Sequence, residues 1–484
     1  IGEGRRDAFK NFLGGKKISV VSGSAYREHL VEDVADGTKG NADLVAYFVL
    51  RAASIVSPRG GFGLLATNTL AQGDTREVAL DRLSAAGWLV YRAVSSRPWP
   101  GGAALEVSHV WMRRGEWASS VQLDDAEVRA ITPALTAQTR VSGNPARLAA
   151  SSGQAFQGCI ALGTGFFLTT GEANVLLETD PRNADVVFRY LGGEDLNDRP
   201  DHSASRWVID FGERSEDEAR SYPAPWALLE QRVKPERSKK DAKKYPRMVN
   251  EWWKFWNPRP AMRRAIRGLD EVIVIALTSK SVQPACVSSA QVFANSLGVF
   301  AYGDAGHFGF LCSGFHWHWA VKYASTMRND LRYTPSDVFE TLAQPGSLGV
   351  VAGAGSAVHS CRGSVMLDRS QGLTRTYNQL HDSSERSTGI VELRQAHEAL
   401  DYAVRDAYDW TDLDLAHGFH ETKQGVRFTF EPSVTQEILD RLLELNRDRY
   451  AEEVRRGLHD KAKKRPRKPS PASASSQQDR LGNW

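Results

Sequence analysis

Apolar residues recur along this chain at two spacings, and each spacing predicts one type of element. Helical spacing over residues 45–56 and 77–87 predicts two amphipathic helices, the second of which ends at Gly87 because glycine is a usual stop signal. Short apolar runs predict strands at 61–70, 88–96 and 103–115, and a Pro/Gly turn (RPWPGG) joins the last two as a hairpin. The first 151 residues are therefore predicted to form an α/β domain.

A polar segment interrupts the apolar pattern in the middle of the chain. Residues 180–211 (DPRNADVVFRYLGGEDLNDRPDHSASRWVIDF) predict a short helix, a Gly-Gly turn, a polar loop and a strand. Loops this polar, set between regular elements, seldom serve only the core. Apolar runs at 270–280 and 287–302 predict further strands, and a second polar block, LRYTPSDVFETL, occupies 331–342. Together these patterns predict a mixed α+β domain over residues 152–345.

The remaining residues predict a helical segment followed by a tail. Residues 390–410 keep their apolar side chains on one helical stripe, and residues 435–458 predict another helix. A helical C-terminal segment is predicted over residues 346–460, and the Gly/Ala/Ser-rich stretch 346–361 at its start is predicted to be a linker. Residues 461–484 are basic and rich in proline and serine, a composition typical of disorder.

Composition limits the class of protein. The 484 residues suffice for about three domains of roughly 150 residues each, and 41% of them are hydrophobic, enough for real cores. The four cysteines are far apart and form no CxxC pair, which argues against a disulfide scaffold or zinc knuckle and for a reducing, cytoplasmic setting. No apolar run approaches the roughly 18 residues of a membrane helix, so we expect no membrane association.

The net charge of +3 says little, but basic residues cluster strongly at one place. Residues 232–247 (RVKPERSKKDAKKYPR) hold eight Lys/Arg against Glu236 and Asp241, and the next segment interleaves Trp252 and Trp253 with further cations. Cations of this kind suit a surface that tracks nucleic-acid phosphates, although a solvated loop is the alternative. Two adjacent tryptophans more often cover a core. The cations expected at the nucleic acid are Lys234, Arg237, Lys239, Lys240, Lys243, Lys244 and Lys254.

Five blocks carry a family resemblance. They are GNADLVAYFVLRA (40–52), the two polar blocks at 180–211 and 331–342, GLTRTYNQLHD (372–382) and HGFHETKQGVRFTF (417–430). In this order they resemble the combined restriction–modification DNA methyltransferases of the MmeI-like, type IIL and type IIG group. The resemblance implies the end of a methyltransferase domain with a partial Rossmann-like class I sheet up to about residue 151. It further implies a target-recognition domain and a helical C-terminal segment.

The same resemblance implies a function. Members of this group methylate adenine N6 at a defined site in double-stranded DNA, with S-adenosylmethionine as the donor. Strand ends and loops of the middle domain would present base-reading side chains, because Arg pairs with guanine and Asn or Gln pairs with adenine. The candidates are Ser279, Lys280, Gln291, Asn295, Arg328, Asn329 and Arg332.

Catalysis is where the chain departs from the resemblance. In the family, an Asn-Pro-Pro-Phe loop holds the flipped adenine and is followed by a Gly-Gly motif, which LGGKK (13–17) matches here. Phe12 falls where the stacking aromatic belongs, but both prolines are lost and the amide of Asn11 is out of register. The catalytic candidates implied by the resemblance are thus Asn11 and Phe12. The alternative is a catalytically inactive module that recognises a DNA sequence.

The donor site is expected outside this chain. The first residue is Ile1 rather than Met, which suggests that the chain begins inside a longer protein, and the family's donor loop would precede it. An upstream methyltransferase or nuclease portion would belong to the same protein. The pairs Gly163/Gly165 and Gly353/Gly355 are not substitutes, because neither opens a GxGxxG helix.

The histidines do not suggest a metal centre. His316 and His318 lie in SGFHWHWAVKYAST, which predicts a helix packed by aromatic side chains. His417 and His420 fall in a loop before the predicted strand VRFTF. A zinc site would need two further ligands at proper spacing, and none stands out.

Overall fold

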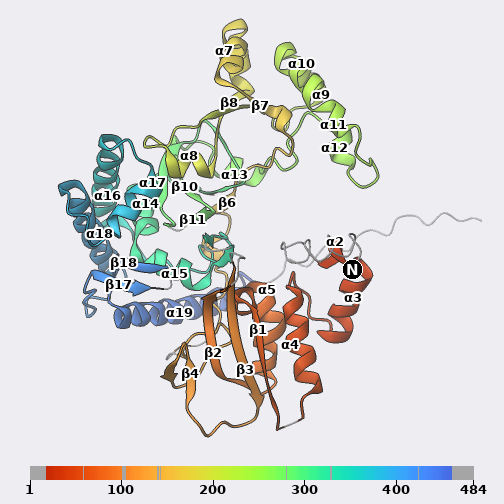
Figure 1. The fold of residues 1–484 in the computed structure, drawn as a ribbon. Helices are drawn as coiled ribbons and strands as arrows, with labels where there is room; N and C mark the ends of the chain where they lie inside the picture. Colours follow the sequence, from red (N-terminus) through yellow and green to blue (C-terminus); the bar gives the residue numbers. More distant parts are fainter. Residues whose placement is uncertain are drawn as a thin grey trace, which may run out of the picture.

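The computed structural model describes residues 18–459, except 58, 101–104, 139–140, 142, 280, 328–329 and 423. An N-terminal unit of one sheet and several helices lies at one end of the molecule, and the rest of the described chain forms a larger body (Figure 1). Within the described residues, no helix is both long enough and apolar enough to cross a membrane.

The N-terminal unit is a five-stranded sheet with helices beside it. The strand order is β1-β3-β2-β4-β5; β3 runs antiparallel to both β1 and β2, and β4 runs parallel to β2. The strands are β1 (Gly61–Thr67), β2 (Trp88–Pro98), β3 (Glu106–Arg114), β4 (Val121–Leu123) and β5 (Ala126–Val128). The helical elements are α2 (Ile18–Val21), α3 (Ser24–His29), η1 (Leu30–Val34), α4 (Leu44–Ile55), η2 (Asn68–Ala71), α5 (Gly73–Arg76), η3 (Glu77–Asp81) and α6 (Arg82–Ala85). The helices, strands and hairpin predicted for this region are confirmed.

A four-stranded sheet at the centre of the larger body is buried on both faces. Its order is β12-β10-β14-β6, and the central strand β10 (Glu271–Ala276) alternates between two cores. Val272 and Val274 contribute to one core, whereas Ile273 and Ile275 contribute to the other, because successive side chains of a strand point to opposite faces. The other strands are β6 (Ala155–Gln157), β12 (Pro284–Ser288) and β14 (Leu297–Phe300).

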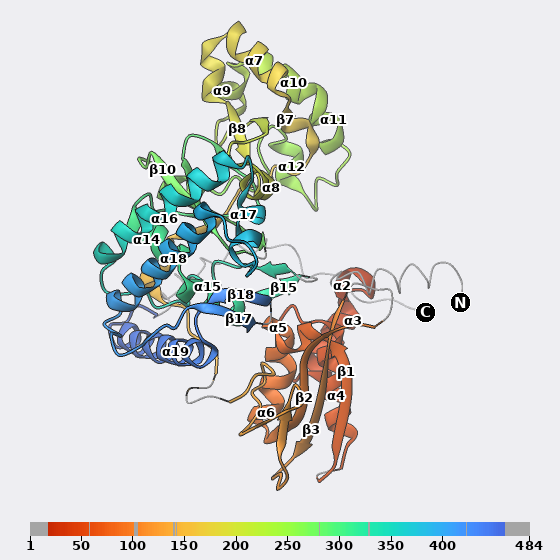
Figure 2. The same ribbon diagram turned by 60° about the vertical axis from the view of Figure 1, so that its left-hand side comes forward.

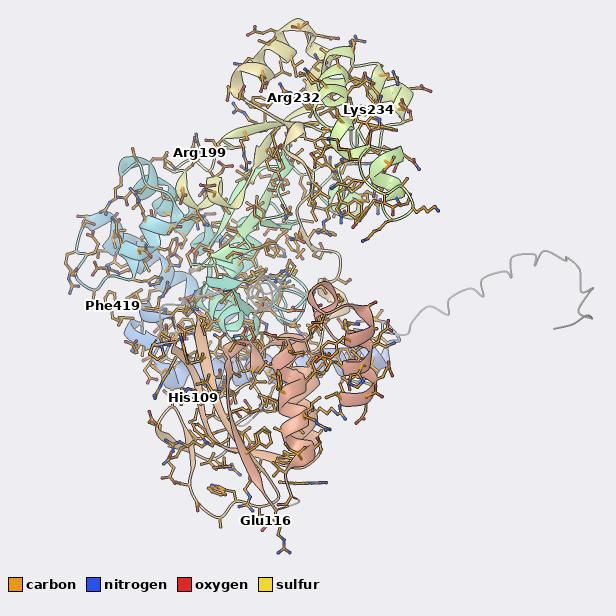
Figure 3. All side chains as sticks on the ribbon, turned by 45° about the vertical axis from the view of Figure 1, so that its right-hand side comes forward. His109, Glu116, Arg199, Arg232, Lys234 and Phe419 are labelled. Carbon is orange, nitrogen blue, oxygen red and sulfur yellow. The ribbon has the colours of Figure 1, made fainter. Side chains whose placement is uncertain are left out.

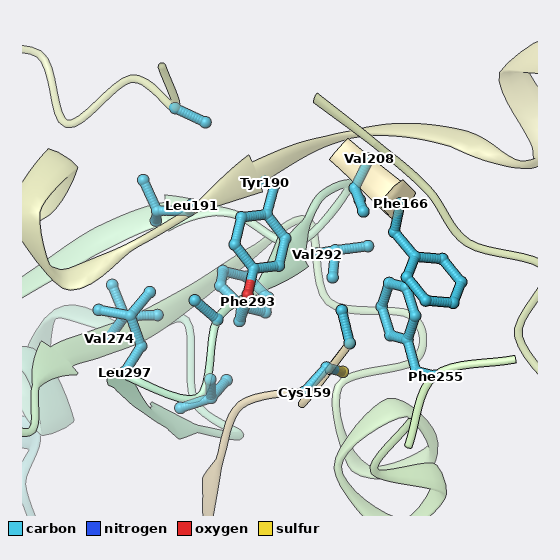
Figure 4. Packing of buried hydrophobic residues seen from close by; sticks show 14 of the residues in the cluster. Cys159, Phe166, Tyr190, Leu191, Val208, Phe255, Val274, Val292, Phe293 and Leu297 are labelled. Atoms are coloured by element: carbon cyan, nitrogen blue, oxygen red, sulfur yellow. The ribbon is translucent and has the colours of Figure 1, made fainter. Parts of the chain in front are cut away.

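Two smaller sheets extend the larger body. One has the order β13-β8-β9-β7 and the other β11-β16-β15. Figure 4 shows how Tyr190 of the first sheet packs with Phe293, Val274 and Cys159 in a shared core. The strands are β7 (Phe167–Leu168), β8 (Val187–Leu191), β9 (Arg206–Ile209), β11 (Thr278–Ser279), β13 (Val292–Phe293), β15 (Ser325–Met327) and β16 (Asp330–Arg332).

The polar block that begins at residue 180 differs from its predicted structure. Its first turn is the short 3-10 helix η6 (Pro181–Asp185), and the residues predicted to continue a helix form strand β8 instead. β-branched and aromatic residues in VVFRYL favour a strand. The segment predicted to be a loop contains helix α8 (Gly193–Asp198), whose start is fixed by Asp195 because its carboxylate accepts hydrogen bonds from the backbone N–H groups of Gly192 and Ser205.

The C-terminal helices cover one face of the central sheet (Figure 2). The predicted linker at 346–361 is wrong, because these residues form most of helix α16 (Gly349–Asp368). A side chain at Gly355 would come within 3.0 Å of the Gly309 Cα, so the small residues permit close packing of two helices. The remaining elements are α14 (Ala305–Cys312), α15 (Gly314–Tyr323), α17 (Leu373–Leu380), α18 (Thr388–Ala407), β17 (Gly418–Thr422), β18 (Gly425–Thr429) and α19 (Pro432–Arg455).

Loss of one ring from the shared core should destabilise the larger body. Phe293 is fully buried, and we expect Phe293→Ala to lower the free energy of unfolding by about 3–5 kcal/mol because it leaves a cavity. The matched control is Phe48→Ala, since Phe48 is 62% exposed and its removal should change stability by less than about 0.5 kcal/mol. Denaturant unfolding measures both; equal effects would contradict the described core.

Candidate nucleic-acid interface

The cationic segment forms a helical layer at the far end of the larger body. It comprises α9 (Glu216–Arg220), α10 (Pro223–Arg232), α11 (Lys234–Arg237) and α12 (Pro246–Asn250), with α7 (Thr170–Thr179) nearby (Figure 1). Residues 238–245 connect α11 to α12 and are named the lysine loop here. Its four lysines, Lys239, Lys240, Lys243 and Lys244, are all exposed. The position of the loop outside the core leaves these charges to solvent or to a ligand.

A short turn gives the lysine loop a defined shape. The carboxylate of Asp241 accepts a hydrogen bond from the Lys243 backbone N–H at 2.8 Å, and the Asp241 carbonyl accepts one from the Tyr245 N–H at 2.8 Å. Such a turn, in which an Asp side chain bonds to the backbone two residues later, is a common local stabiliser. It separates the pair Lys239 and Lys240 from the pair Lys243 and Lys244.

Three tryptophans form the base of this layer. Trp226, Trp252 and Trp253 are each at most 6% exposed, and their ring centroids lie 4.7–5.9 Å apart. The expectation that Trp252 and Trp253 pack in a core is confirmed, although they lie in a turn after α12 rather than on a helix. These rings are therefore not available to stack on bases.

Arg237 is a structural residue rather than a phosphate ligand, which corrects its place among the DNA-contact candidates. It is 2% exposed, and its guanidinium donates hydrogen bonds of 2.6–3.0 Å to four backbone carbonyls. The carbonyls belong to Ala161, Leu162, Trp252 and Lys254. Burial lowers the pKa of Arg237. The guanidinium thus fastens the start of the lysine loop to the core below it.

Two further candidate lysines are partly neutralised within the protein. Lys234 forms an ion pair of 2.6 Å with Glu230, and Lys254 forms one of 2.7 Å with Glu251. The carboxylate of Glu230 has a lowered pKa because Lys234 donates a hydrogen bond to it. Figure 3 shows Lys234 beside Arg232 at the junction of α10 and α11. Of the cations predicted at DNA, the four of the lysine loop carry the most available charge.

Of the described base-reading candidates, Ser279 and Arg332 lie on the paired strands β11 and β16, whereas Gln291 and Asn295 flank β13. Ser279 is 9% exposed and its hydroxyl lies 3.0 Å from that of Ser281, so it faces the protein. Arg332 is exposed on β16, Gln291 donates to the Ser288 carbonyl, and Asn295 is exposed in the turn before β14. The candidates Asn11, Phe12, Lys280, Arg328 and Asn329 lie outside the described residues.

Two exposed arginines on neighbouring strands were missed by the sequence interpretation. The Arg189 guanidinium lies 4.1 Å from the ring of Trp207, and Arg206 lies over Phe167 at 5.2 Å. The rings hold the guanidinium groups in place while their N–H groups stay accessible. In the sequence, Arg189 lies between two aromatic residues in VVFRYL, and Arg206 directly precedes Trp207 in SRWVI. Interpreting VVFRYL as a strand would have identified the two arginines as candidates.

The paired histidines of α15 are packing residues. His316 Nδ1 lies 2.7 Å from the Leu311 carbonyl and its Nε2 lies 2.8 Å from the Tyr333 hydroxyl. His318 Nε2 lies 2.7 Å from the Thr429 hydroxyl. Burial lowers the pKa of His316 to about 4 and that of His318 to about 3, so both are neutral near pH 7. Across the described residues, no three His, Cys, Asp or Glu side chains are grouped to hold a metal.

Comparison with known proteins assigns the region that carries these features. Residues 151–346 match the family described as the target recognition domain of MmeI. This segment is therefore similar to the target recognition domain of MmeI. It contains the lysine loop, the tryptophan base and the exposed strand arginines. No curated protein matches the chain.

Solved structures extend the similarity of fold beyond the target recognition domain. The type IIL restriction–modification enzyme MmeI, solved in complex with DNA, superposes with a TM-score of 0.67 at 18% identity, covering 88% of this chain and 55% of that one. The chain thus spans about half the length of that enzyme. The type IIG restriction endonuclease BpuSI gives a TM-score of only 0.26 at 10% identity, covering 84% of this chain and 52% of that one, and adds nothing to the fold assignment.

Loss of the Arg237 guanidinium should loosen the lysine loop. We expect Arg237→Met to lower the free energy of unfolding by about 2–4 kcal/mol, because it leaves buried carbonyls without donors. Arg237→Lys should not restore this stability, since a single ammonium nitrogen with three N–H donors cannot replace the hydrogen bonds to four carbonyls. Lys239→Met is the exposed control. Unfolding and limited proteolysis within 238–245 are the measurements; wild-type resistance in Arg237→Met would refute the anchoring role.

Proposed function

We propose that this chain is the DNA-recognising portion of a site-specific adenine-N6 methyltransferase of a restriction–modification system. The match of residues 151–346 to the MmeI target recognition domain carries the proposal. The relative of known structure is described as a DNA complex, and we extend double-stranded DNA as a partner to this chain.

Electrostatics supports a duplex as the ligand. The lysine loop projects four exposed charges from a rigid base, and Lys and Arg gain affinity for DNA by releasing counterions from its phosphates. Figures 1 and 3 place the α11–α12 region across from α2 and α3 of the N-terminal unit. We infer that the duplex lies between these two parts, with the lysine loop on its backbone.

The N-terminal sheet supports a methyltransferase portion. Strand β3 lies antiparallel between β1 and β2, an order that fits the closing half of a methyltransferase sheet. Within the described residues, β1 pairs on one side only. Apolar side chains are exposed on β1 and the adjacent helix α4, where Leu65, Phe48 and Ile55 are 53%, 62% and 73% exposed. An open edge beside exposed apolar residues favours the view that the preceding part of the sheet packs here.

Neither glycine pair favours a donor site for S-adenosylmethionine. Gly165 packs against the backbone of Arg232, and Gly353 and Gly355 lie inside α16, so neither pair forms a loop that could cradle the donor. We propose that the donor site is supplied by another part of the whole enzyme.

The alternative function is a DNA-recognition module that cannot methylate. It is favoured by the sequence at residues 9–11, where Phe-Lys-Asn replaces Asn-Pro-Pro. Without the rigid prolines the carbonyl that accepts from the adenine amine is not aimed in advance, and Lys10 adds a cation near an amine that becomes positive during transfer.

Binding and methyl incorporation by this chain alone test sequence recognition and independent catalysis separately. We expect this chain alone to bind a duplex selected from a random pool more tightly than a scrambled duplex, without transferring label from S-adenosylmethionine. Mobility shift and scintillation counting measure the two activities. Equal binding to both duplexes would overturn sequence recognition, whereas label in DNA would show that the chain is itself a methyltransferase.

Charge reversal in the lysine loop tests the location of the interface. We expect Lys239→Glu with Lys240→Glu to weaken duplex binding at least about tenfold at low salt and to reduce the slope of log affinity against log salt by about 2. Arg375→Glu with Arg386→Glu is the control with equal charge change, because both residues are exposed on the C-terminal helical part. Unchanged affinity in the lysine variant would place the interface elsewhere.

A further inference from the structure

A second polar site lies in the C-terminal helices, away from the lysine loop. A partly open cavity of about 40 Å³ lies where the α14–α15 junction, α17, α18 and strand β18 meet the loop before β12. Its wall includes the charged or polar side chains of Gln283, His397, Asp401, His417 and Arg427. Empty protein cavities are apolar, whereas the wall of this one carries polar groups that require partners.

Arg427 is a buried cation without a counter-ion. It is 7% exposed, and among the described residues its guanidinium has no hydrogen-bond acceptor or carboxylate partner. Its one described contact is with the ring of Trp317, 5.7 Å away. Burial alone lowers the pKa of Arg427, with no acidic group opposing the shift. Buried charges in proteins are almost always paired, so this arrangement calls for a ligand.

The only carboxylate in the cavity wall is already engaged. One oxygen of Asp401 accepts a hydrogen bond from the Gly314 N–H at 2.6 Å, and the other lies 2.9 Å from His417 Nε2. His397 Nε2 lies 2.8 Å from the Tyr377 hydroxyl. His381 Nδ1 accepts from the Phe428 N–H at 3.2 Å. Asp401 is thus occupied by these groups and does not pair with Arg427.

Two further polar atoms in the same wall lack partners. His417 Nδ1 and Gln283 Oε1 are both buried and make no hydrogen bond within the described structure. His417 Nε2 is held by Asp401, so its free nitrogen can donate when the ring is protonated and accept when it is neutral. The Gln283 amide can present either its oxygen or its nitrogen after a half-turn. Buried unsatisfied atoms are uncommon, and two of them beside a guanidinium without an acceptor in the described structure indicate a shared ligand.

We propose that this cavity binds one small oxyanion, a carboxylate or phosphate group, held by Arg427, His417 and Gln283. A guanidinium pairs such a group through two parallel N–H donors, and the Gln283 amide N–H can add another. His417 Nδ1 donates to the group only in the protonated ring, because the neutral ring uses its one N–H on Asp401. The volume corresponds to about three water-sized spheres of roughly 10–15 Å³, which limits the bound group to acetate or phosphate size. The argument for this site does not rest on the proposed DNA function. Its ligand is either a free anion or a phosphate of the DNA backbone.

Anion titration of the full chain tests this site. We expect acetate or inorganic phosphate to raise the melting temperature to a saturating value, beyond sodium chloride at the same ionic strength, and to give a calorimetric binding isotherm. Arg427→Met should weaken this binding at least tenfold, and Gln283→Met should weaken it less. Arg386→Met removes an exposed guanidinium and should bind as wild type.

The variants separate ligand binding from folding. Removal of an unpaired buried charge should leave Arg427→Met as stable as the wild type or more so without anion, which circular dichroism can verify. Gln283→Met carries the same test if Arg427→Met does not fold. An absent or non-saturating response of the wild type, or an equal response of wild type and Arg427→Met, would overturn the site. Phosphate binding that persists with duplex bound identifies a free anion, and competition identifies the DNA backbone.

Discussion

The burial of strand β10 on both faces is the constraint on which the larger body depends. Its alternating valines and isoleucines place two cores back to back, one shared with the β8–β9 sheet and the other with the C-terminal helices. Because successive side chains of a strand face opposite ways, a shift of one residue would exchange the two cores. The target recognition domain and the helices after it are therefore one folded unit rather than two units joined by a linker.

The packed larger body explains how the exposed lysine loop can be held in a defined position. Exposed lysines are individually flexible, but the lysine loop begins beside a guanidinium held by four carbonyls, and helix α12, which follows the loop, leads into the packed Trp252 and Trp253. The conformational entropy of the loop is therefore already reduced in the folded protein, before any ligand binds. Charges presented from such a base can track phosphates without carrying sequence information, which must come from side chains in the grooves.

Sequence patterns predicted the elements that have strong periodicity. They gave wrong predictions where the same residue type occurs in two settings, such as small residues in linkers and in packed helices, or arginine on the surface and in the core. The amphipathic helices at 390–410 and 435–458 and the strand at 270–280 follow directly from spacing. The Gly/Ala/Ser run became α16 because small residues also allow helices to approach closely, which no local pattern reveals. Arg237 looked like its exposed neighbours in sequence, and only the fold shows that its position is buried.

Two buried arginines show why the surroundings of a charge, rather than the charge, decide its role. Arg237 and Arg427 are similarly buried, at 2% and 7% exposure. Four carbonyls surround the first, so its N–H groups are occupied and it acts as a fastener. The second faces a cavity whose carboxylate is already bound to a histidine and a backbone N–H. Hydrogen bonds to carbonyls thus offset burial of the first guanidinium, and we propose that an anion does so for the second.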